Sequence, residues 1–309
     1  MGLPSFATPL LQPTLRAALP SPRGGILALL LPLLAIAIAP CLSAQSQTNV
    51  SVDTAVLMRH AVQHQLAADK SHHPVCYLVH RTDERRNTTK EIIETADGDV
   101  ARLVAIDGKP LSAEANRAEL ARLDSLAAHP ETQERRHKSE QKDVETSSHL
   151  LTLFPSAFLY HFEGMVPCPS GKCYHMSFTP NPHFTSPDLE SNVLRGIAGD
   201  VWIDAAQERL TRIEGHFIAE VDFGFGVIGK LNRGGTVLLE ESEVDAHDWE
   251  FTHLTLHVTG KAFLVKSLSF QVNEETSHFS PVPPGLKYRD AIQLLKSSTP
   301  DLINRSNTQ

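Results

Sequence analysis

The feature that most constrains this chain is a long series of alternating apolar and polar residues between positions 199 and 279. Alternation with a period of two is typical of β-strands that have one buried and one solvated face. Five strands are predicted here, at residues 200–203, 209–221, 236–244, 251–259 and 263–276. Several exceed the usual length of about five or six residues, and short turns join them. Long strands with short connections favour a strongly curved antiparallel sheet.

The alternation also predicts which residues share a face of that sheet. In the strand 251–259, Leu254, Leu256 and Val258 point one way, and the polar residues between them point the other way. The neighbouring strands repeat this separation, so one face of the sheet is apolar and the other is solvated. The apolar face therefore needs a cover.

A helical segment supplies candidates for that cover. Leu120, Leu123 and Leu126 recur three residues apart among charged neighbours, which predicts an amphipathic helix over 112–128. Pro130 interrupts the pattern, and a more polar helix is expected to follow over 131–153. We expect these two helices, a helical insert at 112–154, to pack on the apolar face.

The remaining elements complete an α+β fold that is mainly antiparallel. A helix is predicted over 49–70, followed by strands at 74–82, 88–95, 99–106, 157–163 and 173–179, and by a last helix at 288–296. Asp97-Gly98, between the second and third of these strands, is a strong hairpin signal. We expect a single domain over residues 45–297 and a disordered tail at 298–309.

The first 44 residues have the composition of a secretory signal peptide. Arg16 and Arg23 provide positive charge before an uncharged apolar stretch at 26–39. That stretch has about 14 residues, fewer than the roughly 20 that a membrane-spanning helix needs. We expect an exported, periplasmic protein with no membrane span in the mature chain. An outer-membrane tether through a lipidated Cys41 stays open, although Pro40 before it fits that signal poorly.

The charge balance excludes one class of partner. Removal of the first 44 residues takes away Arg16 and Arg23, which leaves 26 of the 28 basic side chains against 36 acidic ones. A protein with this excess of acid lacks the basic surface that nucleic-acid phosphates and anionic membrane surfaces require. We therefore expect no nucleic-acid partner.

The cysteine positions predict one disulfide. Cys168 and Cys173 bracket residues 169–172, which have a turn composition and lie between two predicted strands. A hairpin brings such flanking residues within bridging range, and an exported protein meets the oxidising conditions that disulfides need. Cys76 is expected to be a buried free thiol, because unpaired cysteine behaves as a small apolar residue.

Two motifs suggest a cofactor or a metal, but their context favours structural roles. The segment 224–229 has the spacing G-x-G-x-x-G, yet a strand is predicted soon after it, where a dinucleotide site requires a helix. His60 and His64 share a helical face, and His253 and His257 share a strand face. No third ligand with a neighbouring acid completes a zinc site, and no G-x-S-x-G nucleophile motif is present. We expect no cofactor, no metal site and no catalytic residue.

The strand segment at 200–215 resembles a known superfamily. Asp200-Val201-Trp202-Ile203-Asp204 is followed through a turn by Arg209-Leu210-Thr211-Arg212-Ile213-Glu214-Gly215. This succession is similar to that of the LolA-like, outer-membrane lipoprotein-sorting superfamily of periplasmic lipoprotein carriers, and the chain looks like a poorly characterised exported relative. The resemblance covers residues 199–279 well and the strands between 74 and 106 loosely.

The resemblance implies an incomplete, strongly curved antiparallel barrel that helices cover, with an apolar cavity for acyl chains. The candidates for the cavity wall are residues of the apolar face, namely Ile213, Phe217, Leu254, Leu256, Val258, Leu268 and Phe270. The alternative for each of them is a packed interior with no room for a ligand. The insert at 112–154 and the Cys168–Cys173 hairpin are additions to the superfamily pattern.

Three functions are compatible with the sequence. The first is non-catalytic binding of lipids or lipoproteins in the periplasm, with acyl chains or lipoproteins as partners. The second is a structural or interaction module of the cell envelope that has a filled core and a protein partner. The third is an envelope hydrolase, for which the sequence nominates no residue.

Overall fold

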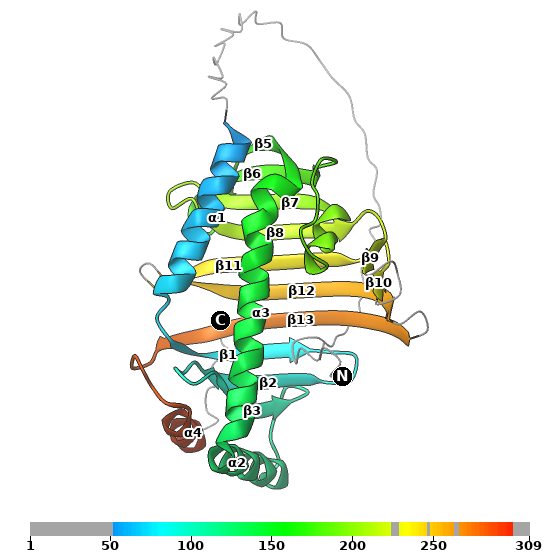
Figure 1. Ribbon diagram of the computed structural model, residues 1–309. Helices are drawn as coiled ribbons and strands as arrows, with labels where there is room; N and C mark the ends of the chain where they lie inside the picture. Colours follow the sequence, from blue (N-terminus) through cyan, green and yellow to red (C-terminus); the bar gives the residue numbers. More distant parts are fainter. Residues whose placement is uncertain (1–51, 224–228, 246–247, 263–265, 299–309) are drawn as a thin grey trace, which may run out of the picture.

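A computed structural model describes residues 52–223, 229–245, 248–262 and 266–298 (Figure 1). Its strands are β1 (Val75–Thr82), β2 (Asn87–Ile93), β3 (Val100–Ile106), β4 (Lys109–Pro110), β5 (Phe158–Cys168), β6 (Gly171–Pro180), β7 (Ile197–Asp204), β8 (Leu210–Phe217), β9 (Val221–Phe223), β10 (Gly229–Leu231), β11 (Thr236–Asp245), β12 (Asp248–Ala262) and β13 (Lys266–Pro281). Its helices are α1 (Thr54–Ser71), α2 (Ala113–Ala128), α3 (Pro130–Ala157), the 3-10 helix η1 (Glu190–Arg195) and α4 (Tyr288–Ser297). The predicted helices and strands occur in the predicted order, with ends that differ by a few residues. The elements β4, β10 and η1 were not predicted, and the strand expected at 209–221 is divided into β8 and β9.

The described strands form one open sheet. The strand order is β4-β3-β2-β1-β13-β12-β11-β8-β7-β6-β5, and β9 and β10 form a short extension beside β12 (Figure 1). The neighbouring strands pair antiparallel. β1 lies beside β13, so the N-terminal strands join the C-terminal strands in the middle of the sheet. The predicted class, α+β with a mainly antiparallel curved sheet that does not close, is confirmed.

Local sequence explains where the helices begin. The Asp53 carboxylate accepts hydrogen bonds from the backbone N–H groups of Ala55 and Val56, which caps α1. The Ser112 hydroxyl caps α2 in the same way. Pro130 is the first residue of α3, a position where a backbone N–H would have no partner inside the helix. The proline that interrupts the helical pattern therefore starts a second helix.

Cross-strand partners show which residues share a face of the sheet. Val201 pairs with Ile213, Ile213 with Leu239, and Leu239 with Leu254. These apolar residues therefore lie on one face, which we call the inner face. Residues between them in the strands, such as Arg212, lie on the opposite face, which we call the outer face.

The helix α1 and the C-terminal part of α3 cover the inner face at the β5–β8 end of the sheet (Figure 1). Met58 and Ala61 of α1 are fully buried in this cluster, together with Met176, Val201 and Ile203 of the strands. The cluster is the largest apolar core among the described residues. Interlocked side chains of this kind leave little free volume.

The helices α2 and α4 lie together at the β3 end of the sheet (Figure 1). Their apolar residues pack against Ile93 and Val100 and against Cys76. Ile93 pairs with both Val100 and Cys76, so the three residues share one face.

That face is the outer one. Arg81 pairs with Glu274, and Glu274 pairs with Leu254, which places Arg81 on the inner face. Cys76 is an odd number of residues from Arg81 in the same strand, so it points the other way. The expectation that both helices of the 112–154 insert cover one apolar face is therefore wrong. Of the two helices of the insert, only α3 crosses the inner face. The outer face of β2 and β3 is also apolar, and α2 packs against it.

Some predictions fall wholly or partly outside the described residues. These are the signal peptide at 1–44 and the tail beyond residue 298. Of the G-x-G-x-x-G segment only Gly229 is described, and it begins β10, which pairs with β9. A strand thus stands where a dinucleotide site would have a helix. No helix within the described ranges combines the length and the hydrophobicity that crossing a membrane would require.

Candidate functional site

All seven predicted cavity residues lie on the inner face. Ile213 and Phe217 are in β8, and the other five are in β12 and β13. The pairs Leu256–Val272 and Val258–Phe270 make the apolar surface continuous between β12 and β13. We call this part of the inner face the apolar strip, and it consists of Leu254, Leu256, Val258, Leu268, Phe270 and Val272.

Burial varies along this surface. Val258 and Val272 are almost fully buried, with 5% and 2% of their surface exposed. Leu254, Leu256 and Phe270 are only half-buried, as are Ile213 and Leu268. Apolar side chains in a packed interior are normally as buried as Met176 in the β5–β8 core. Val258 belongs to a small core with Phe217 and Val221, against which Leu256 also packs. The rest of the apolar strip, apart from Val272, is less well covered than the core beside it.

The reason lies in α3, which runs across the inner face from the β3 end to the β7 end (Figure 1). Its packing partners are near its two ends: α2 at the beginning, and α1, β5 and η1 at the other end. Between them, Glu140, Asp143 and Thr146 are the half-buried side of the helix, whereas Val144 is 63% exposed. The middle of α3 therefore presents polar side chains to the sheet and does not pack against the apolar strip as a core helix would.

Polar contacts fix the beginning of α3. The Gln133 side chain donates hydrogen bonds to the backbone carbonyls of Asp97 and Gly98, 3.1 and 3.0 Å away. The Arg136 side chain donates a hydrogen bond to the backbone carbonyl of Asp99, and the Glu140 carboxylate accepts one from the backbone N–H of Asp99. The helix is thus held at the turn between β2 and β3 by hydrogen bonds, and at its other end by apolar packing.

The apolar strip ends at a group of charges. Glu274 follows Leu268, Phe270 and Val272 at the next inner-face position of β13. Its carboxylate lies 2.6 Å from the Arg81 guanidinium, and both residues are buried. Burial raises the pKa of Glu274, and the charge of Arg81 opposes that rise.

Lys90 lies on the inner face beside this ion pair. It pairs with Val79, two residues before Arg81 in β1. Burial lowers the pKa of Lys90, and the charge of Arg81 lowers it further. Within the described residues no carboxylate forms an ion pair with the Lys90 ammonium. Sequence reasoning missed Lys90, because only the strand register places it on this face.

A second group of ionisable residues lies where α1 ends and β1 begins. The His72 ring is 2.6 Å from Glu94 and 3.5 Å from Glu250, and the hydrogen bond to Glu94 raises the pKa of His72 to about 9. Burial, with the nearby charge of Glu94, raises the pKa of Asp99 to about 7. These groups make the folded state sensitive to pH near neutrality.

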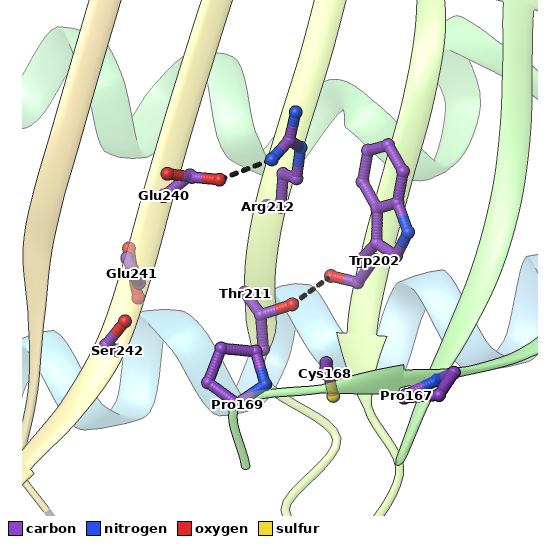
Figure 2. Close-up of a pocket in the computed structure, with 9 residues that line it drawn as sticks. All are labelled: Pro167, Cys168, Pro169, Trp202, Thr211, Arg212, Glu240, Glu241 and Ser242. Carbon is purple, nitrogen blue, oxygen red and sulfur yellow. Dashed lines mark hydrogen bonds and ion pairs between the residues drawn. The ribbon is translucent and has the colours of Figure 1, made fainter. Parts of the chain in front are cut away.

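A pocket of about 340 Å³ lies on the outer face, away from all seven predicted residues (Figure 2). Figure 2 shows the sheet with the helices behind it and with the tip of the β5–β6 hairpin across one side of the pocket. The lining residues are Pro167, Cys168, Pro169, Trp202, Thr211, Arg212, Glu240, Glu241 and Ser242.

The polar side chains of this pocket already have partners. The Trp202 ring stacks on the His175 ring, with 4.7 Å between centroids, and the Arg212 guanidinium lies 5.1 Å from the Trp202 centroid. Arg212 also forms ion pairs with Glu240 and Glu214. The charged and aromatic side chains of the pocket wall therefore interact mainly with one another, through ion pairs and ring stacking. The alternation of β7 and β8 predicts the facing of Trp202 and Arg212, but not the hairpin that encloses them.

The disulfide between Cys168 and Cys173 is present, as the hairpin composition predicts. Cys168, Cys173 and the carboxylate of Asp204 lie within 4.8 Å of one another. The cysteines are oxidised, however, so this group offers no thiolate to a metal. Cys76 is a free thiol, as predicted, but it is half-buried and not fully buried. Burial raises the pKa of Cys76 to about 11, which keeps the thiol protonated near neutral pH.

Three of the four histidines in the two pairs, His60, His64 and His253, lie near carboxylates. His60 and His64 both lie near the Glu208 carboxylate, at 3.3 and 3.9 Å. On the outer face, His253 lies 3.4 Å from Glu240 and 2.8 Å from the side chain of Asn273. These contacts agree with the interpretation of the pairs as surface histidines.

Comparison with known proteins gives two distant structural matches. No family model matches the sequence, and no curated protein matches it. A domain from Vibrio parahaemolyticus described as an outer membrane lipoprotein-sorting protein is 9% identical over 77% of this chain and 99% of its own length, with a TM-score of 0.30. A DUF1329 family protein from Desulfovibrio piger is 11% identical over 82% of this chain and 98% of its own length, with a TM-score of 0.25. At these scores neither match bears on function.

Proposed function

We propose that the protein is a non-catalytic, carrier-like protein that binds the acyl chains of lipids or lipoproteins along the apolar strip. The observation that carries this proposal is the partial exposure of Leu254, Leu256, Leu268 and Phe270 beneath the polar middle of α3. An acyl chain supplies the apolar cover that α3 does not give.

The energetics support an apolar ligand at this place. Each Å² of apolar surface removed from water stabilises by about 25 cal/mol, and each CH₂ group of a buried chain contributes roughly 0.8 kcal/mol. A chain laid along β12 and β13 gains from its own burial and from that of the strip.

We place this function in the periplasm or another exported compartment. The signal-like composition of the first 44 residues supports that location, and so does the Cys168–Cys173 disulfide, because disulfides persist under oxidising conditions. An exported carrier of acyl chains would serve the cell envelope.

A second candidate function is an envelope interaction module. β5 is at the end of the strand order and exposes Leu159 and Met165, which are 53% and 45% accessible. An edge strand with exposed apolar side chains can pair with a strand of a partner protein. Cross-linking in intact cells that recovers only the monomer would count against this role. An envelope hydrolase has no supporting observation.

The test of the carrier function is direct. Lipids are extracted from natively purified protein and identified by mass spectrometry, and uptake of a fluorescent fatty acid is measured on the delipidated protein. Phe270→Glu puts a charge into the apolar strip, and we expect uptake to fall at least tenfold. Gln271→Glu, the matched control, puts the same charge on the outer face of the same strand and should leave uptake unchanged. Absence of both bound lipid and uptake in the unaltered protein would refute the proposal.

A further inference from the structure

We propose that the ligand of the apolar strip is an anionic single-chain lipid, a long-chain fatty acid, whose carboxylate sits beside Lys90 at the Arg81–Glu274 end of the strip. This inference rests on the proposed function and names the ligand class of the same site.

The first support is the layout of the inner face. Leu268, Phe270 and Val272 follow one another along β13, and Leu254, Leu256 and Val258 run beside them in β12. The row along β13 ends at Glu274, six residues from Leu268, a distance of roughly 20 Å at about 3.3 Å per residue. The strip thus runs along two strands, is apolar along its length and ends at charged side chains, which is the layout of a fatty acid.

The second support is the sign of the charge at that end. The ionic groups that act on Lys90 are the guanidinium groups of Arg81, Arg122 and Arg136 and the carboxylate of Glu274. Each of these three guanidinium groups has a carboxylate partner of its own, so among the described residues Lys90 is the one cation of this group without an ion-pair partner. The chain as a whole is acidic, with a formal net charge of −8, so the unbalanced charge of Lys90 is opposite in sign to that of the molecule.

The third support is the pairing within this group. Arg81 has Glu274 at 2.6 Å, Arg122 has Glu119 at 2.7 Å, and Arg136 has Glu140 at 3.7 Å. Lys90, in contrast, has no ion-pair partner within the described ranges.

One unmatched ammonium calls for one negative charge, and a half-buried ammonium gains more from a charged partner than an exposed one. A carboxylate carries one charge. For this reason we commit to a fatty acid and not to a lipid with a more highly charged head group.

Binding of the apolar chain and recognition of the head-group charge can be tested separately. Binding of radiolabelled palmitate and of radiolabelled hexadecanol, an uncharged lipid with a similar chain, is measured on the full delipidated protein. The same measurements are made on Lys90→Gln. The matched control is Lys109→Gln, which removes the same charge from an exposed position in β4. Thermal unfolding of each variant shows whether it is folded.

We expect the unaltered protein to bind palmitate about tenfold more tightly than hexadecanol, the advantage of one charge-assisted hydrogen bond. Lys90→Gln should remove that advantage and leave hexadecanol binding within twofold, whereas Lys109→Gln should change neither. Equal binding of the two lipids, or equal loss in the two variants, would overturn the inference and leave the carrier function standing. Failure to bind either lipid would overturn the carrier function itself.

Discussion

Two regions of one sheet face behave differently in this protein. At the β6–β8 end, Met176, Val201 and Ile203 are buried by at least 99% under α1 and the end of α3. Along β12 and β13, Leu256 and Phe270 occupy equivalent inner-face positions and are only half-buried. The strands of both regions have the same alternation of apolar and polar residues. The difference therefore comes from the helix above them and not from the strands.

The helix α3 crosses both regions, but with different kinds of side chain. Near its end, Leu150, Leu151, Leu153 and Phe154 pack into the β5–β8 core. Earlier in the helix, its half-buried side consists of Asp143 and Thr146, which offer the strip no apolar cover. A single helix can thus pack tightly on one part of a sheet face and loosely on another.

The largest effect that we expect comes from truncation of a side chain in each region. Met176→Ala should lower the free energy of unfolding by about 3 kcal/mol, because it leaves a cavity in a closed core. Leu256→Ala should cost about 1 kcal/mol or less in the ligand-free protein, because solvent already reaches the site. Denaturant titration of both variants measures the difference. Equal losses would mean that the two regions are packed alike.

Loss of the disulfide should be the next largest effect, and it should affect only the packed end. Cys168 and Cys173 close a loop with a sequence separation of 5 residues. Constraint of a loop this short contributes about 2 kcal/mol to stability. Replacement of both cysteines by serine should lower the free energy of unfolding by that amount without a change in fatty-acid uptake. A loss of uptake in the folded variant would show that the hairpin also shapes the apolar strip.

Acidity should strengthen the attachment of α3 at the β2–β3 turn. Burial raises the pKa of Asp99 to about 7, whereas an unfolded aspartate titrates near about 3.9. Between these values the folded state binds more protons than the unfolded state, so the free energy of unfolding decreases as the pH rises. We expect a decrease of about 1–2 kcal/mol between about pH 5 and pH 7.5. Asp99→Asn should flatten this slope, as measured by denaturant titration across pH, and an unchanged slope would assign it to other groups.

The smallest effect on stability should come from making the two regions alike. Asp143→Leu combined with Thr146→Leu gives the middle of α3 an apolar side toward the sheet, and should stabilise the protein by up to about 1 kcal/mol. The same change should reduce fatty-acid uptake several-fold, because the helix then covers the strip. The control Glu145→Leu alters an exposed position of the same turn. Uptake that is unaffected by the double variant would place the ligand elsewhere.

The strand alternation, the hairpin signals and the helical spacing of Leu120, Leu123 and Leu126 were enough to predict most strands, the main helices and the mainly antiparallel class. They depend on local geometry, since side chains alternate along a strand and recur every three or four residues along one side of a helix. The same locality allowed the prediction of the Cys168–Cys173 disulfide, whose partners are neighbours in a hairpin.

The candidate site was only partly predictable. The sequence places Leu254, Leu256, Val258, Leu268 and Phe270 on one face. Glu274 is an even number of residues from Phe270 in the same strand, so the alternation places it on that face too. The neighbours Arg81 and Lys90 come from strands nearly 200 positions away, and their place depends on the pairing of β1 with β13. Long-range pairing of this kind is chosen by the packing of the whole sheet, and a local pattern does not encode it.

The sequence by itself determined a sheet with one apolar face and two helices between its halves. Only the tertiary structure decided that α2 covers one face and α3 the other, and that α3 covers its face unevenly. The physical reason is that a helix covers an apolar surface only where its own apolar side meets it, and the path of α3 brings its polar middle over β12 and β13.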